Sequence, residues 1–309
     1  MVKKKLIFIF LMLANTSVIV FAQQEPQFSQ NMHNILIVNP GYAGSNDAIC
    51  ASVLYRNQWM GFTGAPKTML LNVDGPVKFL RGGIGASVFN DELGVEKTFG
   101  VKFVYAFRMD VGPGQLGIGL QVGFLNKTLQ GSKLEPYIND GSDKTIPISD
   151  INGGSTNFGF GLYYNTDILY FGLSSSQIAE SSVGYSDFNY DLKRHYYIIA
   201  GYTKRITPSL ELIPSVWIKA DPALTPQIDV NILAMYNNQI WVGVSYRVQD
   251  AVVPMIGVKW NNIKFGYSYD VSTSSLKGYN SGSHEIMLGY CFRMPEKKSA
   301  QRYRNVRFL

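Results

Sequence analysis

The chain has 309 residues, of which 46% are hydrophobic, 13% are aromatic and only 16% are charged. The first 22 residues contain three lysines and no acidic residue, so the formal charge of residues 23–309 is 25 − 22 = +3. Such a mild basic excess argues against a nucleic-acid-binding surface, which concentrates Lys and Arg far more strongly. The charged fraction is also below the ~25% that is usual for soluble domains.

The first 22 residues have the three parts of a secretory signal peptide. The lysines at residues 3–5 precede an apolar run over residues 6–21, which ends at the small residue Ala22. We expect cleavage after Ala22. A retained membrane helix is the alternative, but the run is short for a span, and no later run would make the chain a helical membrane protein. The residue directly after Ala22 is Gln23 and not a cysteine, so a lipoprotein anchor is not supported.

Residues 23–48 lack the sustained alternation of a strand, and Asn39-Pro40-Gly41 is a turn signal. The remainder of the chain predicts a barrel wide enough to leave an aqueous hole unless something fills it. We therefore expect this segment to lie inside the barrel mouth as a plug or along its periplasmic rim. A flexible tail is the alternative, because chain ends are often disordered.

From residue 49 to residue 293 the chain consists of segments in which every second residue is apolar. In residues 115–124, the large apolar side chains share one face, and glycine and glutamine occupy the other. A period of two predicts strands with one apolar and one polar face. In an exported chain this poor in charge, we expect an all-β, transmembrane antiparallel up-and-down outer-membrane β-barrel, with lipid on the apolar face. About fourteen strands are predicted, near 49–59, 67–75, 82–90, 97–108, 115–126, 156–165, 168–176, 195–206, 209–219, 226–236, 239–247, 252–260, 263–270 and 284–293.

The connections between these strands give an independent test. Outer-membrane barrels have short periplasmic turns and longer outer loops, so that short and long connections alternate. With the N-terminus in the periplasm, the predicted outer loops include residues 127–155, 177–194 and 271–283. A soluble β-sandwich predicts no such alternation. The predicted periplasmic turns include residues 165–167, 207–208, 237–238 and 261–262.

The alternation also assigns the charged side chains to the lumen, because a charge on the lipid face costs roughly 2–4 kcal/mol near the midplane. The simplest interpretation is that these charges solvate the lumen and pair across strands. Arg56 and Gln58 are the better candidates for holding the N-terminal segment, whereas Tyr55 and Trp59 share the outward face, with Trp59 expected in the aromatic girdle. The candidate lumen or plug contacts are Arg56, Gln58, Lys102, Arg108, Arg247 and Lys259.

The two cysteines lie near the two ends of the predicted barrel. Closure pairs the first strand with the last, and Cys50 and Cys291 fall at the periplasmic ends of these strands with lumen parity. A disulfide that joins the strands is therefore plausible in an exported protein. A shift of the register by two residues would leave two unpaired thiols instead.

Residues 294–309 form a basic C-terminal tail. With an even number of strands, this tail emerges into the periplasm. It is either a docking peptide for a periplasmic partner or the cell wall, or a solvated basic tail. The candidate docking residues are Arg302, Arg304, Arg307 and Phe308.

Two stretches carry a resemblance to a known family. One is Gln23–Met32, continuing to Val38-Asn39-Pro40-Gly41-Tyr42-Ala43-Gly44-Ser45, and the other is Tyr55-Arg56-Asn57-Gln58-Trp59-Met60-Gly61-Phe62 followed by Gly64-Ala65-Pro66-Lys67-Thr68. Together with the C-terminal Arg302–Leu309 stretch, they resemble the PorP/SprF family of Bacteroidetes outer-membrane proteins. The resemblance implies a component or accessory of the type IX secretion system, associated with the export of large surface proteins and with gliding motility. The implied partners are the C-terminal domain of a secreted surface protein at the outer loops and secretion machinery in the periplasm.

No catalytic constellation is recognisable in the sequence. The three histidines have no metal-ligand spacing, and there is no G-x-S-x-G elbow or glycine-rich phosphate cradle. We therefore expect no enzyme activity, cofactor or metal. The predicted function is a non-catalytic secretion and surface-anchoring component, and the alternative is a general diffusion porin or transporter. The division into residues 1–22 (signal peptide), 23–48 (plug or rim), 49–293 (barrel) and 294–309 (tail) follows from these predictions.

Overall fold

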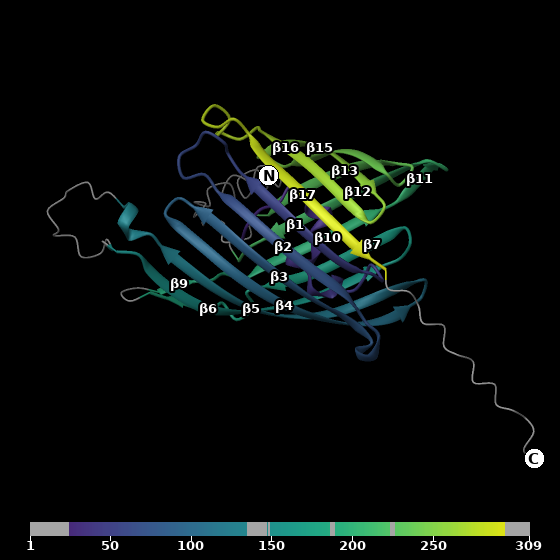
Figure 1. Cartoon of the computed structure of the whole chain (residues 1–309), viewed down its shortest axis with the longest axis horizontal. Coiled ribbons are helices and arrows are strands. Elements are labelled where there is room, and N and C mark those ends of the chain that lie inside the picture. The colour runs from purple at the N-terminus through teal and green to yellow at the C-terminus, as the bar shows by residue number, and fades with distance from the viewer. Residues whose placement is uncertain (1–24, 135–146, 148, 186–188, 223–225, 294–309) are drawn as a thin grey trace, which may run out of the picture.

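The computed structural model describes residues 25–134, 147, 149–185, 189–222 and 226–293. The alternating segments form a closed antiparallel barrel (Figure 1). The predicted signal peptide and C-terminal tail lie outside the described residues. The wall is built of β1 (Ile49–Asn57), β2 (Lys67–Val77), β3 (Gly82–Leu93), β4 (Glu96–Val111), β5 (Gly114–Leu129), β6 (Ile151–Asn165), β7 (Leu169–Ser176), β10 (His195–Tyr202) with β11 (Lys204–Thr207), β12 (Leu210–Ala220), β13 (Gln227–Tyr236), β14 (Ile240–Arg247), β15 (Ala251–Trp260), β16 (Ile263–Ser272) and β17 (Ser283–Phe292).

Each wall strand pairs with its sequence neighbours, and the ring closes where β1 pairs with β17. β10 and β11 both pair with β12, so they are two pieces of one wall strand interrupted near Thr203. The wall therefore has fourteen strands, and the predicted barrel class and strand number are confirmed. Within the described residues, no helix is long and apolar enough to cross a membrane.

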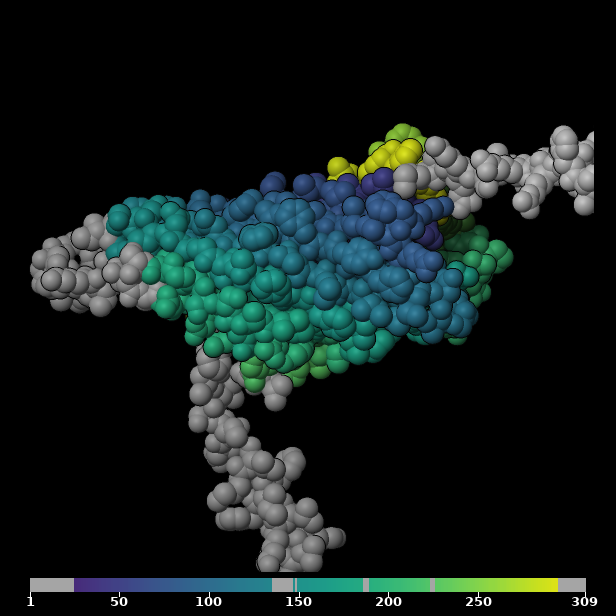
Figure 2. Space-filling model, turned by 90° about the horizontal axis from the view of Figure 1, so that it is seen from below, coloured from purple at the N-terminus to yellow at the C-terminus, as the bar shows by residue number. Residues whose placement is uncertain are grey.

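The two faces of the wall differ as the alternation predicts. On β4, Phe99 and Phe103 are 50% and 55% exposed on the outside, whereas Lys102 between them is 1% exposed and points into the lumen. The same contrast holds around the ring, and Figure 2 shows part of the outer face as a continuous surface. Apolar side chains on this face suit contact with lipid, because charged groups there would be costly.

The two ends of the barrel differ in their connections. At one end, here called the short-turn end, the strands are joined by residues 112–113, 166–168, 237–239 and 261–262, among others. At the other, the long-loop end, residues 58–66, 130–150, 177–194 and 273–282 join them. Two connections at the long-loop end, residues 94–95 and 248–250, are also short. The alternation of short and long connections is thus present but incomplete.

One hairpin was missed by the sequence analysis. β8 (Ser182–Gly184) pairs with β9 (Asn189–Asp191) inside the connection between β7 and β10. Three residues per strand are too few to show a period of two. Val183 and Leu192 are buried and belong to the same apolar cluster as Phe28, so the hairpin extends the interior packing at the long-loop end.

Residues 25–48 are here called the plug, which lies inside the barrel except for its exposed end at residues 46–47. The plug contains three short 3₁₀ helices, η1 (Asn31–His33), η2 (Ile35–Ile37) and η3 (Pro40–Tyr42). Its apolar side chains form the core against the inner wall: Ile37 and Val38 share a cluster with residues such as Leu54. The remaining 3₁₀ turns are η4 (Lys78–Leu80) and η5 (Gly131–Lys133), both in connections.

Candidate functional site

An ionic network on the inner wall faces the first part of the plug. Arg56 on β1 binds Asp270 on β16 (Nη2–Oδ2 2.8 Å) and Glu285 on β17 (Nη1–Oε2 3.2 Å). Arg247 on β14 binds the same Asp270 (Nη1–Oδ2 3.0 Å) and Asp229 on β13 (Nε–Oδ1 3.3 Å). These five side chains, each at most 5% exposed, are defined here as the Arg56 network.

Ser29 of the plug sits at the centre of the Arg56 network. Its hydroxyl donates to Asp270 (2.6 Å) and accepts from Arg56 (2.7 Å). The backbone N–H groups of Ser29 and Gln30 donate to the two carboxylate oxygens of Glu285, both at 2.7 Å. Two arginines face three carboxylates in the network, and these N–H groups add donors where negative charge is in excess. The plug thus completes a buried ionic network that the wall alone leaves incomplete.

A second polar contact lies at the start of the plug. The ammonium group of Lys102 binds Glu25 (Nζ–Oε2 3.4 Å) and donates to the carbonyl of Ile37 (3.3 Å), so it joins two parts of the plug. Lys219 donates to the carbonyl of Glu25 (3.0 Å). Burial alone would raise the pKa of Glu25, but the surrounding positive charges, of which Lys102 acts most strongly, hold it below its ordinary value of 4.5.

His33 forms a further contact that the sequence analysis did not identify. Lys264 lies 2.8 Å from the Nδ1 atom of His33, and the His33 ring packs edge-on against Trp241 with 5.0 Å between centroids. Burial, helped by the charge of Lys264, holds the pKa of His33 well below its ordinary value. The ring is therefore neutral at pH 7, with its Nδ1 within hydrogen-bond distance of Lys264.

The second part of the plug packs on a part of the inner wall that consists of glycines. Asn39 donates to the carbonyl of Leu162 (3.0 Å) and accepts from the N–H of Gly41 (2.9 Å). A Cβ atom on Gly41 would lie 2.8 Å from the carbonyl oxygen of Gly117, and one on Gly119 would lie 2.2 Å from the Gly41 nitrogen. Only glycine on both sides allows the two backbones to approach this closely.

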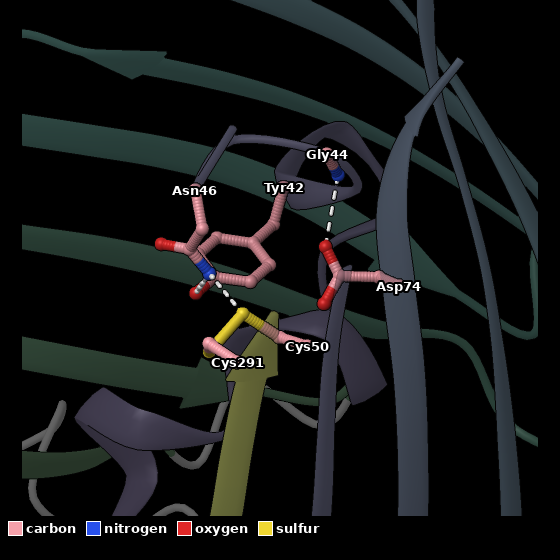
Figure 3. Close-up of a disulfide and its surroundings, with 6 residues drawn as sticks. All are labelled: Tyr42, Gly44, Asn46, Cys50, Asp74 and Cys291. Atoms are coloured by element: carbon pink, nitrogen blue, oxygen red, sulfur yellow. Dashed lines mark hydrogen bonds between the residues drawn. A yellow bond between two sulfur atoms is a disulfide. The ribbon is translucent and has the colours of Figure 1, made fainter. Parts of the chain in front are cut away.

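The plug leaves the lumen next to the β1–β17 seam (Figure 3). Gly44 has a φ of +73°, which favours glycine, and its N–H donates to Asp74 (2.9 Å). Asn46 donates to the hydroxyl of Tyr42 (2.9 Å) and approaches the sulfur of Cys50 (3.8 Å). Burial raises the pKa of Tyr42 to about 12, so its phenol stays protonated at neutral pH.

Cys50 and Cys291 are opposite each other in register and form a disulfide with 4.1 Å between their Cα atoms. The bond joins the first wall strand to the last at the short-turn end, beside the point where the plug becomes β1. The seam of the barrel is therefore closed covalently as well as by hydrogen bonds.

The six candidate lumen residues fall into two groups. Arg56, Lys102 and Arg247 hydrogen-bond to the plug, Arg247 through the carbonyl of Phe28 at 3.4 Å. The other three bond elsewhere. Gln58 is buried beyond the end of β1, and its N–H donates to the carbonyl of Pro66. Arg108 donates to Gln115 and Asn165, and Lys259 donates to Asn238 at the short-turn end.

The alternation in the sequence predicted which side chains point into the lumen, but not how far along the barrel axis each one lies. The two groups differ in this position along the axis. Trp59 also differs from its prediction, because β1 ends at Asn57 and Trp59 lies half-buried in a connection with a φ of 47°. The expected place of Trp59 on the outward face of the strand was therefore wrong. Arg302, Arg304, Arg307 and Phe308 lie outside the described residues.

The plug fills the lumen rather than lining one side. A cavity of about 30 Å³, near the size of one water molecule, lies between Phe28, Asn34 and Trp217. Among the described residues, no group of three or more His, Cys, Asp or Glu side chains is arranged to hold a metal ion. Side-chain and backbone hydrogen bonds tie the plug to β1, β2, β4, β6, β7, β12, β13, β14, β16 and β17.

The family described as type IX secretion system membrane protein PorP/SprF matches residues 20–290 of this chain. No match was found among curated proteins. Among solved structures, the chain is similar to the outer membrane protein Omp33 of Acinetobacter baumannii, with 10% identity, a TM-score of 0.45, and 80% of this chain and 99% of that chain covered. It is also similar to a Pseudomonas aeruginosa FadL homologue, with 10% identity, a TM-score of 0.43, and coverage of 80% and 89%. Haemophilus ducreyi BamA lacking POTRA domains 1-3 shows 8% identity, a TM-score of 0.45, and coverage of 79% and 70%.

Proposed function

Because this chain belongs to the PorP/SprF family of type IX secretion system membrane proteins, we propose that it is a non-catalytic outer-membrane component or accessory of that system. In this role it helps to export a large secreted protein, of the adhesin or gliding type, or to hold it at the cell surface. The barrel serves as a rigid anchor, and its exposed ends bind the other components.

The filled lumen is the observation that carries this proposal. A diffusion porin needs an open aqueous channel lined by solvated charges. Here the lumen charges of Arg56, Arg247 and Lys102 are engaged with the plug instead. A barrel whose interior is occupied by its own chain is suited to binding other proteins at its ends rather than to passing solutes.

The described reactive groups are engaged in structural contacts. Both cysteines are bonded to each other, and His33 and His284 contact Lys264 and Tyr267. This supports a non-catalytic role. We place the secreted protein, through its C-terminal domain, at the long-loop end, which would face the exterior. The basic tail, with Arg302, Arg304, Arg307 and Phe308, would reach periplasmic machinery or the cell wall.

The proposal is tested by purifying the tagged barrel from its native outer membrane and identifying co-purified proteins by mass spectrometry. Recovery of a large secreted protein through its C-terminal domain supports an adaptor dedicated to that protein. Recovery of periplasmic secretion components instead places the barrel in the core machinery. Recovery of neither, together with ion conductance of the purified barrel in a planar bilayer, would overturn the proposal and leave a porin or transporter.

A further inference from the structure

One strand of the wall extends past its neighbour at the long-loop end. β6 has 15 residues and pairs with β5 along all of them, whereas β7 has 8 residues and pairs with β6 only over residues 160–165. One further bond runs from the N–H of Ile178, just after β7, to the carbonyl of Phe158 (3.0 Å). Among the described residues, residues 151–157 of β6 therefore have a paired strand on one side only. Their other side is here called the β6 edge.

The β6 edge presents backbone groups to solvent. Because the Phe158 carbonyl points toward β7, the alternation of a strand directs the N–H and C=O groups of Thr156, Gly154 and Asn152 the same way. All three residues are exposed, and at Gly154 the exposed surface is the backbone itself. The bond that the described residues make to these groups is a long one, from the Ser155 hydroxyl to the Thr156 carbonyl (3.4 Å). The edge thus has donors and acceptors at the spacing of a strand.

The chain that follows β7 does not continue along the β6 edge. Gln177 and Glu180 have φ values of 54° and 47°, in the left-handed region, and they turn the chain away from β6. The β8–β9 hairpin packs instead on the inner face of β6, where a Cβ atom on Gly153 would lie 2.6 Å from the carbonyl oxygen of Gly184. Within the described residues, this hairpin forms a sheet of its own and pairs with no wall strand.

The β6 edge lies beyond the part of the wall that contacts lipid. Phe124 on β5 and Phe158 on β6 are the last outward phenylalanines of their strands, 52% and 45% exposed. Beyond them, the outward positions of the two strands carry polar side chains or glycine: Asn126, Thr128, Thr156, Gly154 and Asn152. The outer face changes from apolar to polar here, which marks the boundary of the lipid band. Unpaired backbone groups are acceptable beyond this boundary because water reaches them, whereas lipid would not satisfy them.

A second copy of this chain does not fit the β6 edge. Two copies in one membrane are related by an axis along the membrane normal. Barrel strands are tilted from that axis, so the β6 strands of two facing copies would cross at about 70–90°, which is twice the usual tilt. Hydrogen-bonded strands need to be far closer to alignment than this. The partner that fits is therefore an extended segment of another protein in the water outside the lipid band.

β11 shows how an exposed edge of the same wall is protected from such pairing. Among the described strands, β11 also has a partner on one side only, β12. It carries the exposed Lys204 and Arg205, and its register shifts between Arg205 and Thr207. Charged side chains and irregular register both discourage the addition of a strand. The β6 edge has neither protection, because residues 152–156 contain no charged residue or proline and their register with β5 is regular.

We propose that an extended segment of the exported protein adds to the β6 edge as a further strand, beside Asn152, Gly154 and Thr156. This inference rests on the proposed function, because it states how the long-loop end holds the exported partner. Backbone groups make the bonds, so the segment needs a strand-forming sequence without proline at the paired positions rather than particular side chains. Pairing of the edge with a second copy or with another segment of this chain would overturn the inference.

The first test measures hydrogen exchange at single-residue resolution in the barrel alone and in the barrel co-purified with the secreted protein. Gly153 and Gly154 are a matched pair, because the N–H of Gly153 points to β5 and the N–H of Gly154 points to the β6 edge. We expect exchange at Gly154 to slow about tenfold or more in the complex, with no change at Gly153. Equally slow exchange at Gly154 in the barrel alone, which pairing within this chain or between copies would produce, would overturn the inference.

The second test removes one donor from the β6 edge. Thr156→Pro deletes an N–H that faces the edge and not β5, and proline is tolerated at such a position of an edge strand. Thr156→Ala is the matched control, because it shortens the same side chain and keeps the N–H. We expect the amount of co-purified secreted protein to fall about tenfold with Thr156→Pro and to stay unchanged with Thr156→Ala. Equal recovery with the two folded variants would contradict the inference. If Thr156→Pro does not fold, the exchange measurement on the unsubstituted chain decides.

The inference and the proposed function fail in distinguishable ways. If no secreted protein co-purifies and surface display is normal in cells that lack the barrel, the proposed function fails. If the secreted protein co-purifies but Gly154 exchanges equally fast with and without it, only the inference about the β6 edge fails.

Discussion

The two halves of the plug are held by different kinds of contact. The first half, around Ser29, depends on long charged side chains that reach inward from the wall. The second half, around Gly41, depends on the absence of side chains, with backbone packed directly on backbone. The charged contacts are lost when a side chain is shortened, whereas the glycine contact is lost when a side chain is added. One segment is thus positioned by electrostatics at one end and by shape at the other.

Replacement of Arg56 by alanine should have the largest effect. It removes the arginine that binds Glu285 and one of the two arginines that bind Asp270, and breaking a buried ionic contact in this way costs about 3–5 kcal/mol. We expect a lower unfolding temperature in detergent and a measurable ion conductance in a bilayer. Lys259→Ala, which removes a charge that is bonded to Asn238 at the short-turn end and not to the described residues of the plug, should change neither. Equal effects of the two substitutions would contradict the role of the Arg56 network.

Loss of the disulfide should have the second-largest effect. It should lower the stability of the wall without changing the position of the plug. Cys50→Ser with Cys291→Ser removes a crosslink between residues that are 241 positions apart in the sequence. We expect a stability loss of about 2–4 kcal/mol, seen as a lower temperature at which the barrel loses its compact migration on electrophoresis. Conductance should remain low, because the plug contacts are unchanged. High conductance in this variant would show that the seam also holds the plug.

Gly41→Val tests the half of the plug that is held by shape. The added Cβ atom would lie 2.8 Å from backbone atoms of Gly117 and Tyr163, and overpacking of this kind costs typically about 1–3 kcal/mol. We expect a cysteine introduced at Ser45, whose hydroxyl is buried, to become more reactive to a soluble thiol reagent, since the exit of the plug is displaced. Gly278→Val is the control, because a Cβ atom there meets nothing within 4 Å.

The smallest effect should be a dependence on pH through Glu25. Its pKa is lower in the plugged barrel than its ordinary value of 4.5, so ionised Glu25 stabilises the plugged state. This contribution is fully present above that ordinary value and is lost as the pH falls through the lowered pKa. A fluorophore at Gln27 should report displacement of the plug on acidification. Glu25→Gln should remove this part of the change, and an identical pH profile in both proteins would contradict the assignment.

Much of the architecture could be predicted from the sequence because alternation is a local property. Contact with lipid on one side of a wall strand favours an apolar residue at every second position, so the strands predicted at residues 49–59 and 263–270 end within two residues of β1 and β16. The β8–β9 hairpin could not be predicted, because its short strands are stabilised by packing on the interior and show no period. The left-handed Trp59 was missed for a related reason, since hydrogen bonds to another connection fix it.

The amino-acid sequence by itself determined the barrel class, the number of wall strands, the sides to which the side chains point and the family to which the chain belongs. Only the tertiary structure decided which inward charges meet the plug and which remain at the short-turn end. Arg56 and Lys259 have the same parity, yet only Arg56 reaches Ser29. The physical reason is that parity follows from one strand alone, whereas depth in the lumen depends on the stagger between strands and on the path of a segment that belongs to none of them.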